Sequence, residues 1–153
     1  MPQTEEKIFD PIRKEWVTAS PEELVRQELL RHMVETLGFP DSLIAVEKSL
    51  KEIPHLVATS SDLPDRRVDI LAFAKDIHPL YPLFPLLVIE CKAVKITEKV
   101  LRQVCGYHHY IHSSYLAVAN AEEVRTGWLD TKAGVYRFVP NLPSFSQLLS
   151  LLK

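Results

Sequence analysis

The stretch Leu-Leu-Val-Ile-Glu-Cys-Lys-Ala, residues 86–93, decides the fold of this 153-residue chain. Its first four residues are apolar without alternation, which is typical of a central strand that is covered on both faces. Because side chains alternate along a strand, Glu90 and Lys92 share one face while Cys91 points to the other. A buried carboxylate is costly unless it is paired or binds a metal, so Glu90 is the first candidate functional residue.

A second carboxylate interrupts the preceding apolar segment. Residues 68–74 (VDILAFA) have the composition of a strand, and Asp69 stands between two branched apolar residues. Residues 78–85 contain three prolines and are therefore expected to form the connection between the two strands. If the strands pair as a hairpin, Asp69 and Glu90 approach each other at one end of the sheet.

Two carboxylates and a lysine form a set that suits phosphodiester hydrolysis. Carboxylate oxygens are ligands for Mg²⁺ or Mn²⁺, which polarises a phosphate and lowers the pKa of a bound water. A lysine such as Lys92 can orient that water or stabilise charge that develops on the phosphate. The alternative reading leaves Asp69 as a carboxylate in a turn at a strand end, and Glu90 and Lys92 as an exposed pair at a strand tip.

The rest of the chain predicts an α/β domain around these strands. Residues 1–19 are expected to be an irregular N-terminal extension, and residues 20–153 a single domain. Ser20 begins a helix that runs to about Leu37, with proline next and glutamate at the third position. The remaining predicted elements are a strand at 42–50, a helix at 97–113, a strand at 115–119, a hairpin at 124–130 and 135–139, and a short helix at 143–152. This order predicts a central mixed sheet with helices on both sides.

The predicted helix after Lys92 adds candidate polar residues. Gln103 and Tyr107 are four residues apart and therefore share a face that could look over the end of the sheet. An ordinary solvated position is the alternative for Gln103. Cys105, His108 and His112 fall within one arc of the helix and could suit zinc, although core packing explains them as well.

Basic residues flank the proposed site in the sequence. They could contact phosphates, or they could form an ordinary solvated surface. These residues are Arg66, Arg67, Lys95, Lys99 and Arg102.

Composition narrows the classes of function. The chain is 46% hydrophobic and 25% charged, as in ordinary globular proteins, and its net charge of -2 gives no global basic field for nucleic acid. Two cysteines make no disulfide framework, and no glycine-rich nucleotide loop is present, so no nucleotide cofactor is expected. The longest apolar run is far too short to span a bilayer and no signal peptide is visible, so we expect a cytoplasmic protein without membrane contact.

These motifs resemble a known family. Asp69 in VDILAF, Glu90-Cys91-Lys92 and the spacing of Gln103 and Tyr107 match the D…ExK…QxxxY pattern of the PD-(D/E)XK nuclease superfamily. More narrowly, the chain is similar to the N-terminal nuclease domain of type I restriction enzyme R subunits, and to stand-alone bacterial proteins with that domain. Residues 21–27 (PEELVRQ) and 42–48 (SLIAVEK) match its first helix and strand, and the resemblance spans residues 20–139.

The resemblance implies a restriction-endonuclease-like fold and a role for each matching residue. Asp69 and Glu90 would be metal ligands for Mg²⁺ or Mn²⁺, and Lys92 would be the catalytic lysine. Gln103 would belong to the catalytic set, with Tyr107 in support. Superfamily members often add an acidic residue of the first helix to the metal site. Glu23 is the candidate here, with the neighbouring Glu22 as second choice.

The implied activity is hydrolysis of DNA as an endonuclease or exonuclease. Type I R subunits carry a motor after this domain and this chain ends at Lys153, so we expect a separate motor or partner protein, or a homodimer. The alternative, from another class, is a nucleic-acid-binding or regulatory module that kept the fold and is catalytically weak or inactive.

Overall fold

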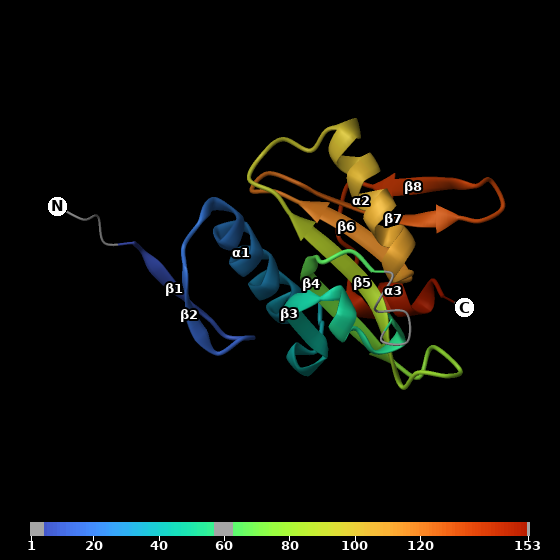
Figure 1. The fold of residues 1–153 in the computed structure, drawn as a ribbon, viewed down its shortest axis with the longest axis horizontal. Coiled ribbons are helices and arrows are strands. Elements are labelled where there is room, and N and C mark those ends of the chain that lie inside the picture. The colour runs from blue at the N-terminus through green and yellow to red at the C-terminus, as the bar shows by residue number, and fades with distance from the viewer. Residues whose placement is uncertain (1–4, 57–62, 153) are drawn as a thin grey trace.

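The structure, a computed structural model, describes residues 5–56 and 63–152, apart from the side chain of Tyr107. Three α-helices separate or follow groups of consecutive strands along the described chain (Figure 1). The elements are β1 (Lys7–Asp10), β2 (Glu15–Thr18), α1 (Pro21–Glu35), η1 (Asp41–Leu43), β3 (Ile44–Ser49), η2 (Leu50–Glu52), β4 (Arg67–Lys75), β5 (Leu83–Cys91), α2 (Glu98–Ile111), β6 (Tyr115–Ala119), β7 (Val124–Asp130), β8 (Val135–Val139) and α3 (Phe145–Ser150).

The central sheet is mixed, as the sequence predicts. Its six strands follow the chain in the order β3-β4-β5-β6-β7-β8. The β5 and β6 strands are parallel and the other neighbours are antiparallel. Parallel neighbours need a crossover connection, and α2 supplies it between β5 and β6.

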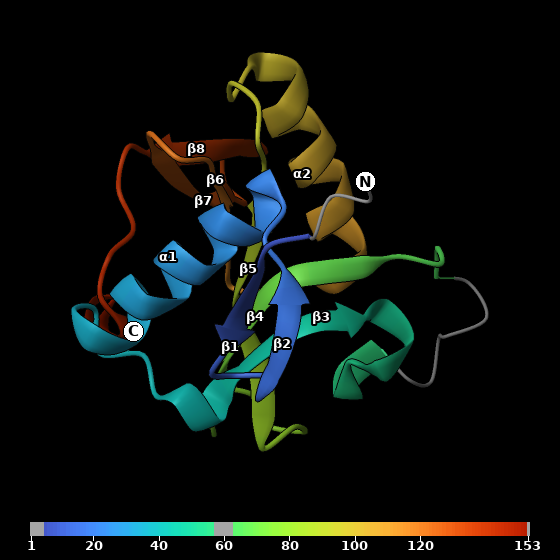
Figure 2. The same cartoon turned by 90° about the vertical axis from the view of Figure 1, so that its left-hand side faces the viewer.

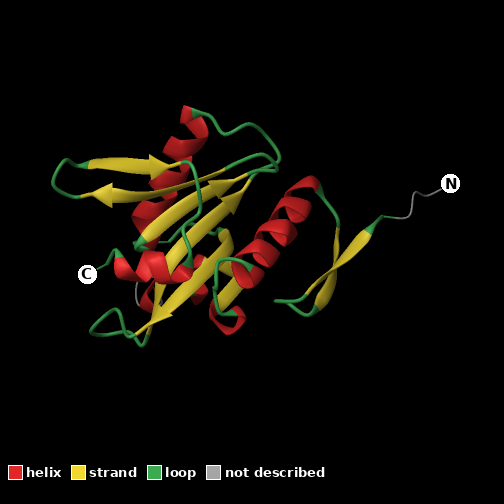
Figure 3. Cartoon of the chain, turned by 180° about the vertical axis from the view of Figure 1, so that it is seen from behind, coloured by secondary structure: helices red, strands yellow, loops and turns green. Residues whose placement is uncertain are grey.

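Helices cover both faces of the sheet, which confirms the predicted α/β architecture. Figure 2 shows α1 and α2 on opposite sides of the strands, and Figure 3 shows α1 and α3 together over the same face. Apolar residues alternate between two cores along β5. Leu87 and Ile89 pack in the core under α1 and α3, while Val88 packs under α2 with Leu101 and Val104.

The extension before α1 is not irregular, contrary to the sequence prediction. The β1 and β2 strands pair antiparallel, with Lys7 opposite Thr18 and Asp10 opposite Glu15. The Asp10 carboxylate accepts hydrogen bonds from the backbone amides of Ile12 and Arg13, which closes the turn between the strands. Each strand has only four residues, too few to show a clear alternating pattern.

The first helix begins as predicted, and it buries charged as well as apolar residues. The Ser20 side chain accepts a hydrogen bond from the amide of Glu23, which is the expected N-cap. Its buried residues are Val25, Leu29, Leu30 and Met33, together with two charged residues, Glu23 and Arg26.

The β5 strand begins at Leu83, before the predicted start at Leu86, because Pro85 is accommodated within the strand. Pro85 lies inside β5 opposite Phe73, at the point where the register between β4 and β5 shifts. Proline has no N–H to give to the ladder, and a bulge is one of the few places in a sheet that accepts it.

Candidate functional site

Two carboxylates meet where β4 begins and β5 ends. In the antiparallel register Ile70 lies opposite Ile89, so the next residues outward are Asp69 and Glu90. The Asp69 Oδ2 atom accepts a hydrogen bond of 2.7 Å from the backbone amide of Cys91, which ties the aspartate to the neighbouring strand. The structure therefore brings together the two carboxylates that the sequence proposes as metal ligands.

Both carboxyl groups have raised pKa values. Burial is the main cause for each, and for Glu90 the negative charge of Asp69 is the second, so the pKa of Glu90 rises to about 7. Burial also raises the pKa of Asp69, although the amide of Cys91 and the charge of Arg26 act in the opposite direction. Two buried carboxylates in contact disfavour each other's charge, and a bound cation would relieve that cost.

Lys92 lies next to the carboxylate pair. Its Nζ atom is 4.0 Å from Glu90 Oε2, and its side chain is 32% exposed, so the ammonium group can reach a ligand from solvent. Its backbone amide donates a 2.8 Å hydrogen bond to the carbonyl of Ala119. That bond continues the β5–β6 ladder by one residue and fixes the base of the lysine.

A cavity of about 520 Å³ opens beside Glu90 and Lys92. One wall comes from α2, which contributes Gln103, Gly106 and Tyr110. Gln103 is exposed, as expected for a solvated helix position. It also lies in the cavity wall, on the side of α2 that faces Glu90 and Lys92. Pro64, Arg66 and Val104 complete the lining. Glu90 and Lys92 therefore face an open cavity, and a ligand from solvent can reach them there.

Glu23 is not part of the carboxylate pair. Its two oxygens accept hydrogen bonds from the side chains of Arg13, Arg26 and Gln27. Burial alone would raise the pKa of Glu23, but these hydrogen bonds outweigh burial and lower it. In this conformation Glu23 faces two guanidinium groups, and Arg26 lies between it and Asp69.

The remaining predicted residues divide into those at the cavity and those beside it. Arg66 lines the cavity, and Arg67 is exposed at the start of β4. Lys95, Lys99 and Arg102 are exposed on and before α2, but they do not contribute to the described cavity wall. Glu22 is exposed in the first turn of α1. Tyr107 belongs to α2, and its side chain lies outside the described part of the structure.

The zinc alternative on α2 finds no support. Both ring nitrogens of His108 are engaged, Nε2 with the Ser113 carbonyl and Nδ1 with the Tyr136 hydroxyl. Within residues 5–56 and 63–152, no group of three or more histidine, cysteine, aspartate or glutamate side chains could hold a metal ion. Any divalent ion at Asp69 and Glu90 would therefore take its further ligands from water or substrate, a mode that suits Mg²⁺.

The sequence interpretation missed Arg26 and Glu47. Arg26 Nη1 lies 2.5 Å from Glu47 Oε1 and 3.4 Å from Asp69 Oδ1. The spacing of Glu23, Arg26 and Gln27 at three and four residues was the available signal, because such residues are neighbours on a helix. It does not show which face of the helix they occupy, and an arginine on a buried face is uncommon.

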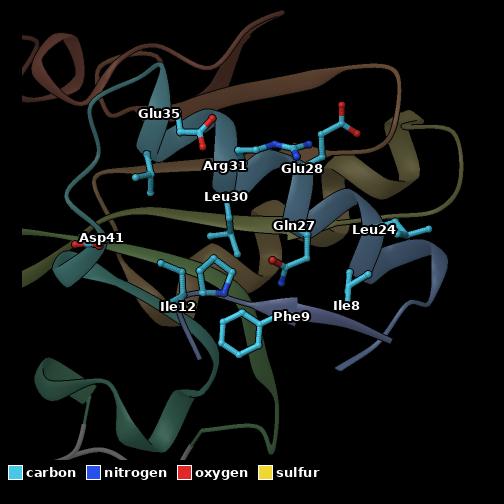
Figure 4. A pocket seen from close by; sticks show the side chains of 12 residues that line it. Ile8, Phe9, Ile12, Leu24, Gln27, Glu28, Leu30, Arg31, Glu35 and Asp41 are labelled. Carbon is cyan, nitrogen blue, oxygen red and sulfur yellow. The ribbon is translucent and has the colours of Figure 1, made fainter. Parts of the chain in front are cut away.

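A second cavity, of about 790 Å³, lies between the N-terminal hairpin and α1 (Figure 4). Its lining is mainly apolar, with Phe9 and Ile12 from the hairpin side and Leu24 and Leu30 from the helix. None of the proposed catalytic residues lines it. The cavity beside Glu90 is therefore the candidate active site.

No helix in the described part of the chain is long and apolar enough to cross a membrane.

Comparison with known proteins identifies the family to which the chain is similar. Residues 21–143 match the family described as type I restriction enzyme R protein N terminus (HSDR_N), and this range contains Asp69, Glu90, Lys92 and Gln103. Searches of curated proteins and of solved structures gave no significant match. The match covers most of the chain and confirms the resemblance seen in the sequence. The chain therefore belongs to the family of type I restriction enzyme R protein N-terminal domains.

Proposed function

We propose that this domain is a Mg²⁺- or Mn²⁺-dependent deoxyribonuclease of the PD-(D/E)XK kind, acting as an endonuclease. One observation carries the proposal: Asp69 and Glu90 lie side by side with Lys92 next to them, and Glu90 and Lys92 line an open cavity. The family match supports a restriction-related module, and the chemistry of these three side chains supports hydrolysis of a phosphodiester within it.

The residues at the site fit a divalent cation. Asp69 and Glu90 offer hard oxygen ligands, and Mg²⁺ commonly binds through one or two carboxylates together with water and phosphate oxygens. The raised pKa values show that the pair holds its negative charge at a cost, which a cation would remove. When bound, the metal would polarise the phosphate and lower the pKa of the attacking water.

The other side chains have separable roles. The Lys92 ammonium group would stabilise the negative charge that develops on the phosphate, or hold the attacking water. Gln103 would orient a phosphate or water from the α2 wall with its amide. Arg66 would contact the backbone of the nucleic acid at the cavity, and the exposed Arg67, Lys95, Lys99 and Arg102 would extend that contact. DNA is the proposed substrate, and a partner protein or a second copy of this chain is the proposed binding partner.

The test is cleavage of supercoiled plasmid and of single-stranded DNA in Mg²⁺ or Mn²⁺. We expect Asp69→Asn to abolish cleavage and Lys92→Ala to reduce it by about 100-fold or more, because each removes stabilisation of the transition state. Conversion of supercoiled to open-circular plasmid identifies an endonuclease. EDTA should stop the reaction.

Matched controls separate the site from general effects of charge. Lys132→Ala removes an exposed lysine in the β7–β8 turn, and Asp41→Asn neutralises an exposed aspartate before β3. Both should cleave like the wild type. Equal cleavage by all variants would indicate a contaminating nuclease. Wild-type protein that binds DNA and never cleaves it, with Lys92→Ala unchanged in affinity, would instead favour the binding or regulatory module.

A further inference from the structure

A buried arginine connects the first helix to the candidate metal site. Arg26 on α1 is 7% exposed. Its Nε and Nη2 atoms donate to the two oxygens of Glu23, at 2.8 Å and 3.0 Å, in a bidentate pair. Its Nη1 atom donates to Glu47 on β3 at 2.5 Å, and it lies 3.4 Å from Asp69 Oδ1 and 3.5 Å from the Asp69 carbonyl oxygen. One side chain therefore bridges α1, β3 and β4.

Asp69 is held from two sides. Its Oδ2 atom accepts from the Cys91 amide, and its Oδ1 atom faces Arg26. Glu47 lies on the neighbouring strand, and its negative charge repels that of Asp69. The guanidinium group of Arg26 lies against both carboxylates and offsets their repulsion. A planar donor group with fixed geometry suits this place better than a flexible ammonium group.

Glu47 has an unusual backbone for a strand residue. Its φ angle is +58°, in the left-handed region that non-glycine residues rarely adopt. Such a conformation persists only where surrounding interactions maintain it, and Arg26 is the described hydrogen-bond partner of the Glu47 side chain. Glu47, the strained residue, is therefore the residue of β3 that contacts Arg26, and Arg26 in turn faces Asp69.

The other end of the connection lies in the N-terminal hairpin. Arg13 donates to Glu23 and to Asp10, and the Asp10 side chain is fully buried. Gln27, which also donates to Glu23, lines the cavity between the hairpin and α1 (Figure 4). The hairpin precedes residue 21, where the family match begins, so an element outside the matched region reaches toward the site.

We propose that Arg26 is a positioning residue for Asp69, and that Glu23 and Arg13 hold Arg26 in place from the hairpin side. Ion pairs that are largely removed from solvent fix orientation when every donor and acceptor is satisfied. The proposal rests on the proposed function for what Asp69 does, because orientation of a metal ligand depends on the groups that hold it. The orientation itself can be tested without metal or DNA.

The backbone amide of Cys91 reports the orientation of Asp69, because it donates to the Asp69 carboxylate. We would measure its hydrogen exchange by NMR in metal-free wild type, Arg26→Gln, Arg26→Lys and Asp69→Ala. Asp69→Ala shows the exchange rate when the acceptor is removed. We expect exchange at Cys91 to be about 10-fold faster in both Arg26 variants, with core amides such as Val88 unchanged.

The matched control is Arg31→Lys, an exposed arginine five residues further along the same helix. It should leave the exchange of Cys91 at the wild-type rate. Arg26→Gln could unfold the protein, because it removes an ion-pair partner from three carboxylates, Glu23, Glu47 and Asp69. Arg26→Lys keeps the charge, and so decides the question if Arg26→Gln is unfolded. Wild-type exchange at Cys91 in folded Arg26→Lys would overturn the proposal.

A second measurement separates this proposal from the proposed nuclease. Mn²⁺ affinity, measured by calorimetry, should be lost in Asp69→Asn and weakened about 10-fold in Arg26→Lys, since a misplaced ligand binds its metal less tightly. Arg13→Lys should show a smaller change in the same direction. Wild-type protein that binds no Mn²⁺ would count against the nuclease, while exchange at Cys91 would still decide the role of Arg26. Tighter Mn²⁺ binding in Arg26→Lys would show that Arg26 competes with the metal, and would overturn the positioning role.

Discussion

At the scale of single residues, ionisation of Glu90 is the main cost of the candidate site to the stability of the folded protein. The side chain is buried beside Asp69, and its pKa is raised from the ordinary value of 4.5 to about 7. A carboxyl group with a raised pKa destabilises the folded protein once it must ionise. Active sites commonly hold such groups because their function requires them.

This cost predicts the pH dependence of stability for metal-free protein. At pH 4 the carboxyl is largely protonated in both the folded and unfolded states, so Glu90 has little effect. Between about pH 4.5 and 7 the unfolded chain releases the proton and the folded protein retains it, so the free energy of unfolding falls. Glu90→Gln should therefore stabilise the protein by on the order of 2 kcal/mol at pH 8, and by little at pH 4.

Urea unfolding in EDTA at these two pH values measures the effect. Glu28→Gln, at an exposed position of α1, is the matched control and should show no such difference between the two pH values. A Glu90→Gln variant that is no more stable than wild type at pH 8 would contradict the burial of an ionised carboxylate. Saturating Mg²⁺ should reduce the advantage of the variant, because only the wild type keeps both proposed metal ligands.

Residue patterns predicted the carboxylate pair but not the groups that hold it. Asp69 and Glu90 stand out because each interrupts an apolar strand, and pairing of consecutive strands brings them together. Arg26 and Glu47 do not interrupt any pattern, since charged residues are common in helices and on edge strands. Their contact depends on how α1 packs against β3 and β4, which is tertiary information. Glu23 has the predicted location on α1, but its partners are arginines.

At the scale of elements, two glycines are predicted to behave in opposite ways. Gly127 lies in β7, where an added Cβ would be 2.7 Å from the Phe138 ring and 2.8 Å from the Arg137 carbonyl oxygen on β8. Gly127→Ala should therefore destabilise the protein by about 1–3 kcal/mol, because the adjacent backbone must move.

Gly106 provides the matched comparison, in the α2 wall of the candidate site. An added Cβ there meets nothing within 4 Å. Gly106→Ala should stabilise the protein by about 0.5–1 kcal/mol, since alanine favours a helix interior. Thermal melting measures both variants. A destabilising Gly106→Ala, or a neutral Gly127→Ala, would show that the local packing differs from the structure.

The strength of the local signals explains which elements could be predicted. The β6, β7 and β8 strands follow clear apolar or turn patterns, and their predicted bounds agree with the structure. The β1 and β2 strands are four residues each and polar, so their pairing depends on the turn at Asp10 and on contact with α1. Pro85 argued against a strand, and only the neighbouring bulge makes it acceptable.

At the scale of the whole molecule, the hairpin and the domain are connected through buried charge. Removal of residues 1–19 would leave Glu23 without Arg13 and would uncover the apolar surface against which Ile12 packs. We expect the shortened chain to lose about 2 kcal/mol or more of unfolding free energy, because it loses an ion pair to a buried carboxylate together with the apolar contact of Ile12. Urea unfolding at pH 7 measures the loss.

The control for this truncation is Trp16→Ala in the full chain. Trp16 is 67% exposed, and its removal leaves the ion pairs of the hairpin intact. Its stability should stay within about 0.5 kcal/mol of wild type, as is usual at exposed positions. Equal stability of the shortened chain and the full chain would show that the hairpin is an appendage without energetic connection to α1.

The connection between β4 and β5 offers a practical handle on this protein. Asp69 lies near the beginning of β4 and Glu90 near the end of β5, so residues 76–82 are at the opposite end of the same two strands. A nine-residue strand spans roughly 26 Å, and Leu80 at this remote tip is 77% exposed. A fluorophore or affinity tag attached there would be carried on the two strands of the candidate site, at the end away from Asp69 and Glu90. Labelled protein could then be used in metal-binding and DNA-binding measurements without a probe beside Glu90 and Lys92.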